Sequence, residues 1–218
     1  MKEQNVTVIN NPLTQHYLST IRNKNSSILE FKHAIEILGN ILAINSIQNL
    51  PLEEIETETP ITTAKTNIID SKIDIFITPI LRAGLGISQS LVNILPFAKV
   101  QHLGMYRNEK TLEPVWYYNK LPQNFKNPQN SFVYICDPML ATGGSAIEVI
   151  KLYIEKNIPQ ENITFINLIC SPEGLNRITT LFPKIKIFTC SIDEKLNEKG
   201  YIVPGLGDAG DRIFNTIY

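Results

Sequence analysis

The fold of this chain is decided by one stretch, Phe132-Val133-Tyr134-Ile135-Cys136-Asp137-Pro138-Met139-Leu140-Ala141-Thr142-Gly143-Gly144-Ser145. Its first five residues are apolar or aromatic, and such a run is too short and too rich in β-formers for a helix. They therefore predict a buried strand, which Pro138 ends because proline cannot donate to a strand ladder. The segment from Thr142 to Ser145 then opens an amphipathic helix, since isoleucines follow it at helical spacing.

The glycine turn between this strand and this helix predicts an anion site. Unpaired N–H groups and the positive end of the helix dipole point at whatever occupies such a turn. Gly143 and Gly144 let the backbone approach a ligand without a Cβ in the way, and Thr142 and Ser145 add hydroxyl donors. The ligand class that fits is a phosphate.

Asp137 narrows the kind of phosphate compound. A nucleotide-triphosphatase loop is excluded, because that motif requires a lysine after its last glycine and none follows Gly144. At the end of the strand, the carboxylate of Asp137 can instead accept hydrogen bonds from two vicinal hydroxyls of a sugar whose 5′-phosphate lies in the turn. A strand-to-helix turn without a ligand is the alternative, but a turn alone does not require Asp137, Thr142 and both glycines together.

The order of apolar strand, acid, four residues and Thr-Gly-Gly-Ser resembles the phosphoribosyl-pyrophosphate (PRPP) loop of type I phosphoribosyltransferases. The form Asp-Pro-Met-Leu-Ala-Thr-Gly-Gly-Ser is similar to the version in uracil phosphoribosyltransferases. Most of the superfamily has a second acid where this chain has Pro138, and that departure is itself typical of the uracil enzymes. This resemblance extends from about Pro60 to Tyr218 and is poorer before it, where the family often carries an arginine near the position of Lys32.

Length and composition limit the size class, the partners and the location that we expect for this chain. A chain of 218 residues is long enough for one large domain, and a net charge of −1 gives no global field for nucleic acid or an anionic membrane. Three cysteines lie in apolar runs without C-x-x-C spacing, so we expect buried, reduced thiols. The first residues contain no apolar segment of a signal peptide, and no stretch approaches 18 apolar residues. We therefore expect a soluble, cytoplasmic protein.

Strand-like and helix-like segments alternate along the chain, which predicts an α/β fold with a mainly parallel central sheet flanked by helices. Residues 1–25 read as a polar arm, and residues 48–60 read as a loop whose acidic run is solvated. Between them a helix begins after Ser27, which has the spacing of a capping box with Glu30. The expected strands are residues 61–69, 73–78, 163–169 and 185–190, with a long β-hairpin from residues 100–106 and 115–118.

Two further stretches look like the pyrophosphate side of the family's site. The loop Pro79–Gly86 follows a strand and carries Arg82, whose planar fork suits phosphate oxygens. The charged hairpin tip Gly104–Pro114 matches a flexible flap in which the family's arginine, here Arg107, touches the pyrophosphate. The aromatic residues 116–118 in the same hairpin are interpreted as hairpin packing rather than base stacking.

The stretch Tyr201–Asp211 contains Gly205-Leu206-Gly207-Asp208-Ala209-Gly210, which matches G-x-G-x-x-G. A dinucleotide site is nevertheless excluded, because its βαβ unit has no room in the eight residues that remain after Gly210. The stretch instead resembles the family's uracil-binding loop. The resemblance places uracil contacts at Ile202, Gly207, Asp208 and Ala209, and it also brings Asp208 to PRPP.

The resemblance implies a type I phosphoribosyltransferase-like domain over residues 1–218, with a small hood at about residues 1–60, a β-hairpin flap and a base-binding loop at about residues 200–211. It implies the reaction of uracil with PRPP to give UMP and pyrophosphate, with Mg²⁺ carried by PRPP and no direct metal ligand. The implied catalytic residues are Asp137, Arg107 and Asp208. The implied PRPP contacts are Arg82, Arg107, Asp137, Pro138, Met139, Leu140, Ala141, Thr142, Gly143, Gly144, Ser145 and Asp208.

The resemblance further implies a homodimer or homotetramer, with GTP as an activator, and neither nucleic acid nor membrane as a partner. Two alternatives on the same fold are a pyrimidine-responsive RNA-binding regulator and a catalytically silent subunit. The regulator would need a basic face, whereas 20 basic residues stand against 21 acidic ones. A silent subunit would show eroded motifs, whereas all three motifs are intact.

Overall fold

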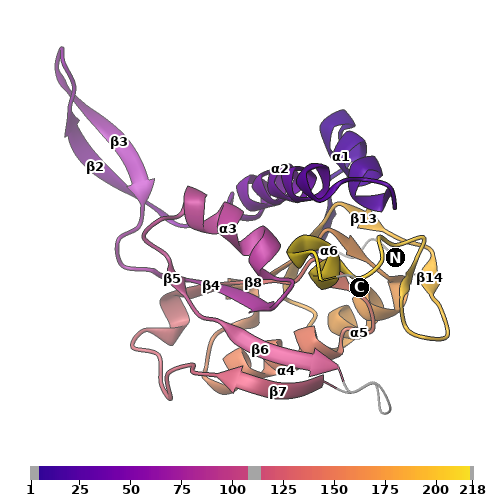
Figure 1. Ribbon diagram of the computed structural model, residues 1–218. Helices are drawn as coiled ribbons and strands as arrows, with labels where there is room; N and C mark the ends of the chain where they lie inside the picture. Colours follow the sequence, from indigo (N-terminus) through magenta and orange to yellow (C-terminus); the bar gives the residue numbers. More distant parts are fainter. Residues whose placement is uncertain (1–4, 108–113, 217–218) are drawn as a thin grey trace.

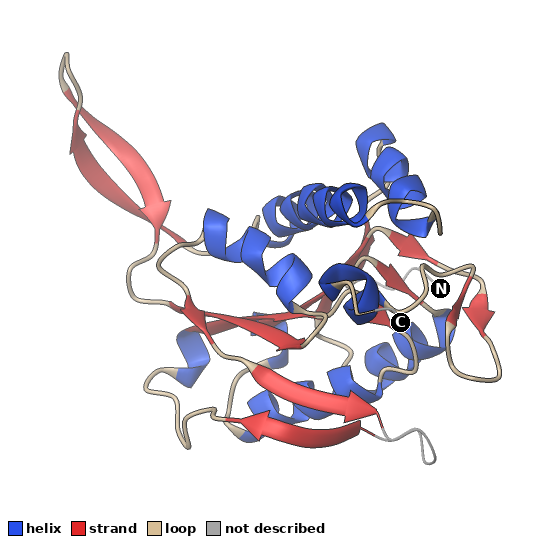
Figure 2. Ribbon diagram, viewed as in Figure 1, coloured by secondary structure: helices blue, strands red, loops and turns tan. Residues whose placement is uncertain are grey.

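A mainly parallel sheet forms the centre of the computed structural model, which describes residues 5–107 and 114–216 (Figures 1 and 2). Its strands are parallel except for the antiparallel pair β6–β7. In spatial order they are β1 (Val6–Val8), β12 (Lys186–Thr189), β10 (Ile163–Ile166), β8 (Ser131–Cys136), β4 (Asp74–Leu81), β6 (Leu103–Arg107) and β7 (Pro114–Asn119), with β5 (Lys99–Val100) also paired to β4.

Helices cover both faces of this sheet (Figure 2). One face packs against α1 (Pro12–Arg22), α2 (Ile28–Ser46) and α3 (Leu85–Ile94), and the other against α4 (Gly144–Glu155) and α5 (Pro172–Leu181). The alternation of side chains along a strand explains the division. Along β8, Tyr134 and Cys136 lie in the α1–α3 core, whereas Val133 and Ile135 lie in the α4–α5 core. The predicted α/β fold with helices on a mainly parallel sheet is confirmed.

Smaller elements complete the chain. The short strands β9 (Met139–Leu140), β11 (Ile169–Cys170) and β13 (Ser191–Ile192) form a parallel sheet of their own. The remaining elements are the antiparallel pairs β2 (Leu52–Glu58) with β3 (Thr63–Ile69) and β14 (Lys195–Leu196) with β15 (Ile202–Val203), the short helix α6 (Ala209–Phe214), and 3₁₀ turns at Pro128–Asn130 and Gln160–Asn162.

Local capping signals are confirmed. Ser27 accepts a hydrogen bond from the Glu30 amide, and the Glu30 side chain accepts one from the Ser27 amide in return, which is the predicted capping box. Ser171 caps α5 and Pro172 is its first residue. All three cysteines are buried, as predicted. In the described part of the chain, no helix combines the length and apolar character needed to cross a membrane.

The predicted polar arm over residues 1–25 is wrong for most of its described length. Val6–Val8 adds a strand to the edge of the central sheet through β12, and Pro12–Arg22 is a helix whose N-cap is Asn11. The amphipathic spacing of Leu18 and Ile21 buries one face of α1 against the core. An apolar face of only a few residues was therefore enough to fold a segment that is polar on average.

The predicted loop over residues 48–60 is also wrong, because Leu52–Glu58 pairs with Thr63–Ile69 in a regular hairpin. Its exposed acids Glu54, Glu56 and Glu58 alternate with half-buried residues on the opposite face, as in a strand. Cross-strand partners support the pairing: the Lys65 Nζ donates to Glu54 Oε1 at 2.8 Å, and the hydroxyls of Thr57 and Thr66 lie 2.6 Å apart. Solvation of the acidic run, as expected, does not prevent a strand.

Two strands differ from the prediction, one in where it ends and the other in its continuity. The strand before Arg82 continues through Pro79 to Leu81, because Pro79 is paired with Cys136, where β8 ends, and β6 takes over as the neighbour beyond it. The single strand expected at residues 163–169 is interrupted between β10 and β11, so that Ile169 and Cys170 pair with β9 and β13 instead of continuing the main sheet.

A buried hydrogen bond ties β4 to α4, the helix that follows the predicted phosphate loop. The hydroxyls of Thr78 and Tyr153 lie 2.6 Å apart, and both residues are fully buried. We expect Tyr153→Phe to destabilise the fold by about 1–2 kcal/mol, because the Thr78 hydroxyl loses its partner without access to water. Chemical denaturation measures this change.

The double variant Thr78→Val/Tyr153→Phe should recover part of that loss, since it removes both polar groups together. Tyr118→Phe, at a residue with 39% exposure, is the matched control and should change stability by less than about 0.5 kcal/mol. Equal stability of Tyr153→Phe and the wild type would contradict the importance of this bond.

Candidate active site

A cavity of about 510 Å³ lies where β4 and β8 end. Parallel sheets bind ligands at this edge, because the turns that leave the strands can diverge there. Its walls come from the ends of β4 and β8, from β6 and β7, and from α4 and α6. The lining residues are Ile80, Leu81, Arg82, Ala83, Met105, Tyr106, Tyr117, Asp137, Pro138, Met139, Ser145, Asp208, Ala209 and Gly210.

Asp137 lines this cavity and follows immediately after β8. Its main-chain N–H donates to Ile166 O at 3.1 Å, which fixes the residue against β10. Burial raises the pKa of its carboxyl to about 7; a hydrogen bond from the Met139 amide opposes that rise, and the nearby charge of Asp208 adds to it. The ionised form of Asp137 is therefore poorly solvated and suited to accept hydrogen bonds from a ligand.

The predicted phosphate turn has the geometry that the sequence indicated. Gly143 has a φ of +78° and precedes the first turn of α4, so the helix N-terminus points at a second cavity of about 100 Å³. Asp137, Met139 and Ser145 line both cavities, which are thus neighbours. The remaining residues of the smaller cavity are Leu140, Ala141, Thr142, Gly143, Gly144 and Ala146.

Helix α5 orients the peptide groups of this turn. Ser171 Oγ donates to Ala141 O at 2.7 Å, and Arg177 Nη1 donates to Thr142 O at 3.1 Å. Because the N–H of a trans peptide points opposite to its C=O, the amides of Thr142 and Gly143 face away from α5. The hydrogen bonds from α5 therefore leave these two N–H groups for an anion in the turn.

The turn between β4 and α3, residues 82–84, carries Arg82 to the same cavity. A Cβ on Gly84 would lie 2.3 Å from Cys136 O, so only glycine allows the loop to pass this close to the end of β8. The peptide bond between Leu81 and Arg82 is cis. Arg82 Nη2 donates to Asp211 Oδ1 at 3.2 Å, and the guanidinium is partly exposed and free to exchange this partner for an anion.

The Tyr201–Asp211 stretch contributes Asp208, Ala209 and Gly210 to the cavity wall, next to Arg82. Asp208 is the N-cap of α6, and its Oδ1 accepts from the Asp211 amide at 2.9 Å. Gly207 has a φ of +83°, and a Cβ on it would meet only Arg212 Cδ, at 3.8 Å. Ile202 is buried in the α1–α3 core, so only its main-chain groups remain for a ligand.

Seven of the predicted site residues thus meet around one cavity: Arg82, Asp137, Pro138, Met139, Ser145, Asp208 and Ala209. Ile202 and Gly207 are not among its lining residues. The side chain of Arg107 and the hairpin tip at residues 108–113 lie outside the described residues, so the predicted flap contact is not described.

Seven lining residues were not among the predicted contacts. Four of them, Ile80, Leu81, Ala83 and Gly210, lie beside predicted residues, whereas Met105, Tyr106 and Tyr117 come from the hairpin strands. The rings of Tyr106 and Tyr117 stack across the hairpin with centroids 6.5 Å apart, so the predicted hairpin packing is confirmed for Tyr117. The same pair also faces the cavity. Only the pairing of β6 with β4 decides this, and that pairing could not be read from local sequence.

The comparisons with known proteins agree with one another. A family model described as "Uracil phosphoribosyltransferase" matches residues 8–216, which extends the likeness well before residue 60, where the sequence analysis had expected it to weaken. A protein of Lactococcus lactis subsp. cremoris named uracil phosphoribosyltransferase is 46% identical over 209 residues, covering 96% of this chain and 97% of its own length. One of the same name from Thermoanaerobacter is 46% identical, covering 98% of this chain and 99% of its own length.

Solved structures with a similar fold cover most of this chain. A protein of Aquifex aeolicus has a TM-score of 0.88 and 36% sequence identity, with 98% of this chain and all of that chain covered. An adenine phosphoribosyltransferase of Trypanosoma brucei has a TM-score of 0.55 at 12% identity, covering 94% of this chain and 88% of its own, which shows a shared fold alone.

The raised pKa of Asp137 predicts a pH-dependent stability. Between its ordinary value of 3.8 and about 7, the folded protein keeps the carboxyl protonated while the unfolded chain ionises it, so stability falls as pH rises through this window and levels off above it. Asp137→Asn removes the effect. We expect the stability of this variant relative to the wild type to increase by about 2 kcal/mol from pH 5 to pH 8.

Urea denaturation at several pH values measures this difference. Glu155→Gln, which changes an exposed acid on α4, is the control and should leave the pH dependence of the wild type unaltered. A stability difference between Asp137→Asn and the wild type that stays constant from pH 5 to pH 8 would show that Asp137 is not held in a desolvated site.

Proposed function

The chain belongs to the uracil phosphoribosyltransferase family, and from this premise we propose how its cavity converts uracil and PRPP into UMP and pyrophosphate. The observation that carries the proposal is the meeting of Asp137, Ser145, Arg82 and Asp208 around one cavity. An acid, a phosphate turn and an arginine in this arrangement match the three polar parts of PRPP: its ribose hydroxyls, its 5′-phosphate and its pyrophosphate.

We assign each part of PRPP to one of these groups. The 5′-phosphate occupies the smaller cavity, where the amides of Thr142 and Gly143 and the N-terminus of α4 meet it. Asp137 accepts hydrogen bonds from the 2′- and 3′-hydroxyls. Arg82 exchanges its contact with Asp211 for the pyrophosphate, and Arg107 and Asp208 contribute from the hairpin and the base loop.

The reaction transfers the ribosyl group from pyrophosphate to the base. The bond between C1 and the pyrophosphate oxygen loosens first, which leaves an oxocarbenium-like sugar, and N1 of uracil then forms the new bond and loses its proton. The residues around the cavity hold the two reactants in line and bind the developing negative charge on the leaving group. No residue of the chain has to form a covalent intermediate.

Magnesium fits this site as a companion of the substrate. Among the residues that the structure describes, no cluster of three or more His, Cys, Asp or Glu side chains could hold a metal ion. The two carboxylates of Asp137 and Asp208 face the cavity, and Mg²⁺ is commonly bound by one or two carboxylates together with substrate phosphates. When bound, the ion supplies neutralisation of pyrophosphate charge.

The base is read mainly by main-chain groups. The family contacts correspond to Ile202 and to Gly207–Ala209, and the side chain of Ile202 is committed to the core. Uracil offers O2 and O4 as acceptors and N3–H as a donor, whereas cytosine offers an acceptor at N3 and donors at N4. A fixed set of backbone donors and acceptors satisfies one of these patterns and leaves buried groups unpaired with the other.

A panel of bases tests the proposal. With Mg²⁺ and PRPP, we expect the purified protein to form UMP from uracil and to prefer uracil over cytosine by ~10⁴-fold or more in kcat/KM. In Gly207→Val the KM for uracil should rise by about tenfold or more, because a β-branched residue is strained at the positive φ of Gly207. The KM for PRPP should change far less.

Asn157→Val provides the matched control, since Asn157 also has a positive φ, of 63°, but lies after α4, away from the base loop. It should cost stability without changing the KM for uracil. Equal use of cytosine by the wild type would refute the reading of uracil by this loop, and so would an unchanged KM for uracil in Gly207→Val.

We also propose that the protein is a homodimer in which the β2–β3 hairpin packs on a second copy. The hairpin projects away from the rest of the chain (Figure 1). Isolated two-stranded hairpins are marginally stable in water. This one also exposes apolar side chains, with 61% of Leu52, 94% of Ile61 and 42% of Ile68 accessible. A groove beside its base, lined by Ile68, Ile73, Phe97 and neighbours, continues the apolar surface.

Ile68→Glu should convert the dimer to monomer at micromolar concentration, because a charge would be buried in the contact. Sedimentation velocity measures the change. Leu29→Glu, at a position on α2 with 76% exposure, is the control and should remain dimeric. A monomeric wild type, or a dimeric Ile68→Glu, would contradict the proposed contact.

Activation by GTP and a cytoplasmic location remain part of the proposal. The first is supported by the family resemblance alone. The second is supported by the sequence, in which three cysteines lie in apolar runs without C-x-x-C spacing, as expected of a protein from a reducing compartment.

A further inference from the structure

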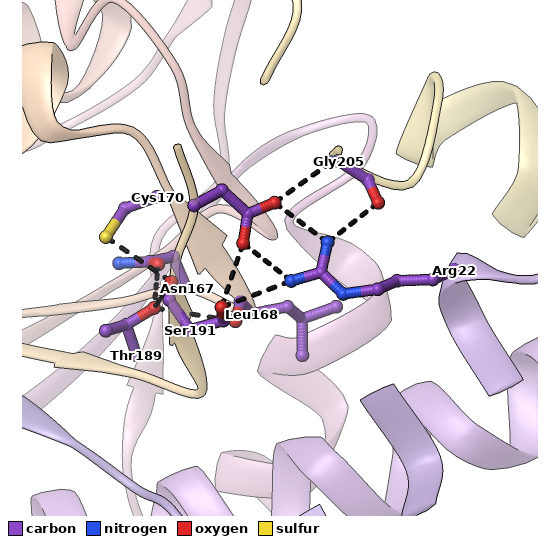
Figure 3. A network of polar contacts seen from close by, with 8 residues as sticks. Arg22, Asn167, Leu168, Cys170, Thr189, Ser191 and Gly205 are labelled. Carbon is purple, nitrogen blue, oxygen red and sulfur yellow. Dashed lines mark hydrogen bonds and ion pairs between the residues drawn. The ribbon is translucent and has the colours of Figure 1, made fainter. Parts of the chain in front are cut away.

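The last residue of α1, Arg22, reaches a carboxylate far along the chain (Figure 3). Its Nη2 donates to Asp193 Oδ1 at 2.6 Å and its Nη1 donates to Asp193 Oδ2 at 2.8 Å, which is a two-pronged ion pair. Only 1% of the Asp193 side chain is exposed, against 25% of Arg22. This pair does not line the cavity, and no motif in the sequence indicated it.

Both members of the pair also bind the main chain of Gly205. Arg22 Nη1 donates to Gly205 O at 2.8 Å, and the Gly205 N–H donates to Asp193 Oδ2 at 2.9 Å. Both polar groups of Gly205 are thus engaged (Figure 3). Ser191 Oγ completes the network: it accepts from Arg22 Nη2 at 3.1 Å and donates to Asp193 Oδ1 at 2.8 Å.

Gly205 lies between the two base-contacting segments of the proposed site. It follows Ile202 by three residues and precedes Gly207 by two. A Cβ on Gly205 would lie 2.2 Å from Ile202 O, so the backbone folds back on itself here. The position of Gly205 therefore determines where the main-chain groups on either side of it point.

A second arginine holds the same loop against the same helix end. Arg212 Nη1 donates to Leu206 O at 2.7 Å and also to Ile21 O, and its Nη2 donates to Asn23 O at 2.8 Å. Its guanidinium lies over the Phe31 ring, 4.0 Å from the centroid. Arg22 and Arg212 thus connect the C-terminal end of α1 to two successive residues of this loop, Gly205 and Leu206.

The charge state of Asp193 fits this arrangement. Burial pushes the pKa of its carboxyl upward, but the hydrogen bonds from Arg22, Ser191 and Gly205 and the charge of Arg22 outweigh it, so that the pKa lies below its ordinary value. Buried ion pairs contribute little net stability, because desolvation offsets their attraction. Stability of the fold alone therefore does not account for the pair.

We propose that Arg22 and Asp193 are positioning residues for base recognition, which set the backbone of the base loop through Gly205. The inference rests on the proposed function, in which main-chain atoms read uracil. Backbone readers cannot adapt by changing rotamer, and a displacement of about 1 Å costs on the order of 100-fold in rate. The ion pair, which lies outside the cavity, fixes the position of the main-chain groups that contact the base.

Arg22→Gln and Arg22→Lys test this role in the full-length protein. In Arg22→Gln the KM for uracil should rise by about 10- to 100-fold, while the KM for PRPP should stay within about threefold. Arg22→Lys keeps the charge but loses the planar fork, so it should recover only part of the uracil affinity. Asp193→Asn removes the charge from the other partner and should show the same division between the two KM values.

Lys24→Gln is the matched control, because Lys24 is an exposed cation in the loop after α1. It should leave both KM values unchanged. Circular dichroism confirms that each variant is folded, and Arg22→Lys, the mildest change, gives the decisive reading where Arg22→Gln does not fold.

The outcomes separate the inference from the proposed function. A wild type that converts no uracil would overturn the proposed function itself. A wild type that converts uracil, with an unchanged KM for uracil in folded Arg22 and Asp193 variants, would overturn only the positioning role. An equal rise of both KM values would also overturn it, since that pattern indicates a general disturbance of the fold.

Discussion

The close approach of two neighbouring parallel strands at their carboxyl ends is the constraint on which this site depends. Strands β4 and β8 end side by side, and the chain that leaves β4 passes directly over the last carbonyl of β8 at Gly84. This contact brings Arg82 and Asp137 to one cavity. Any side chain at Gly84 would push the two turns apart, and with them the groups proposed to bind the two ends of PRPP.

Like charges are brought close together around this cavity. Asp137 and Asp208 face the same space, and their repulsion and the burial of Asp137 raise the pKa of Asp137. Arg82 turns to Asp211 instead. A substrate that brings hydroxyl donors, phosphates and a divalent cation would satisfy all of these groups at once. The contacts that bind such a substrate would then also stabilise its transition state.

In the proposed mechanism, recognition of the base follows a different principle, because main-chain groups make the contacts with the base. Main-chain groups cannot change rotamer. The accuracy with which such a loop recognises a base therefore depends on the contacts that fix its backbone. In this chain the hydrogen bonds of Arg22 and Arg212 connect the base loop to the C-terminal end of α1. In the proposed mechanism, α1 thus contributes to the site without lining the cavity.

The sequence by itself determined the elements whose determinants are local. Strand, acid, glycine turn and helix N-terminus follow one another between residues 132 and 145, so the phosphate turn and the place of Asp137 could be predicted. The capping of α2 and α5 and the burial of the cysteines were predictable for the same reason. The positive φ of Gly207 is likewise a property of a few neighbouring residues.

Only the tertiary structure decided the contacts between residues far apart in the chain. Arg22 and Asp193 are separated by 171 positions, and neither has a neighbour in sequence that indicates the other. The acidic strand β2 exists because β3 pairs with it, and Tyr106 and Tyr117 face the cavity because β6 joins β4. Local composition carries no information on such pairings, since their free energy comes from partners that the folded chain alone brings together.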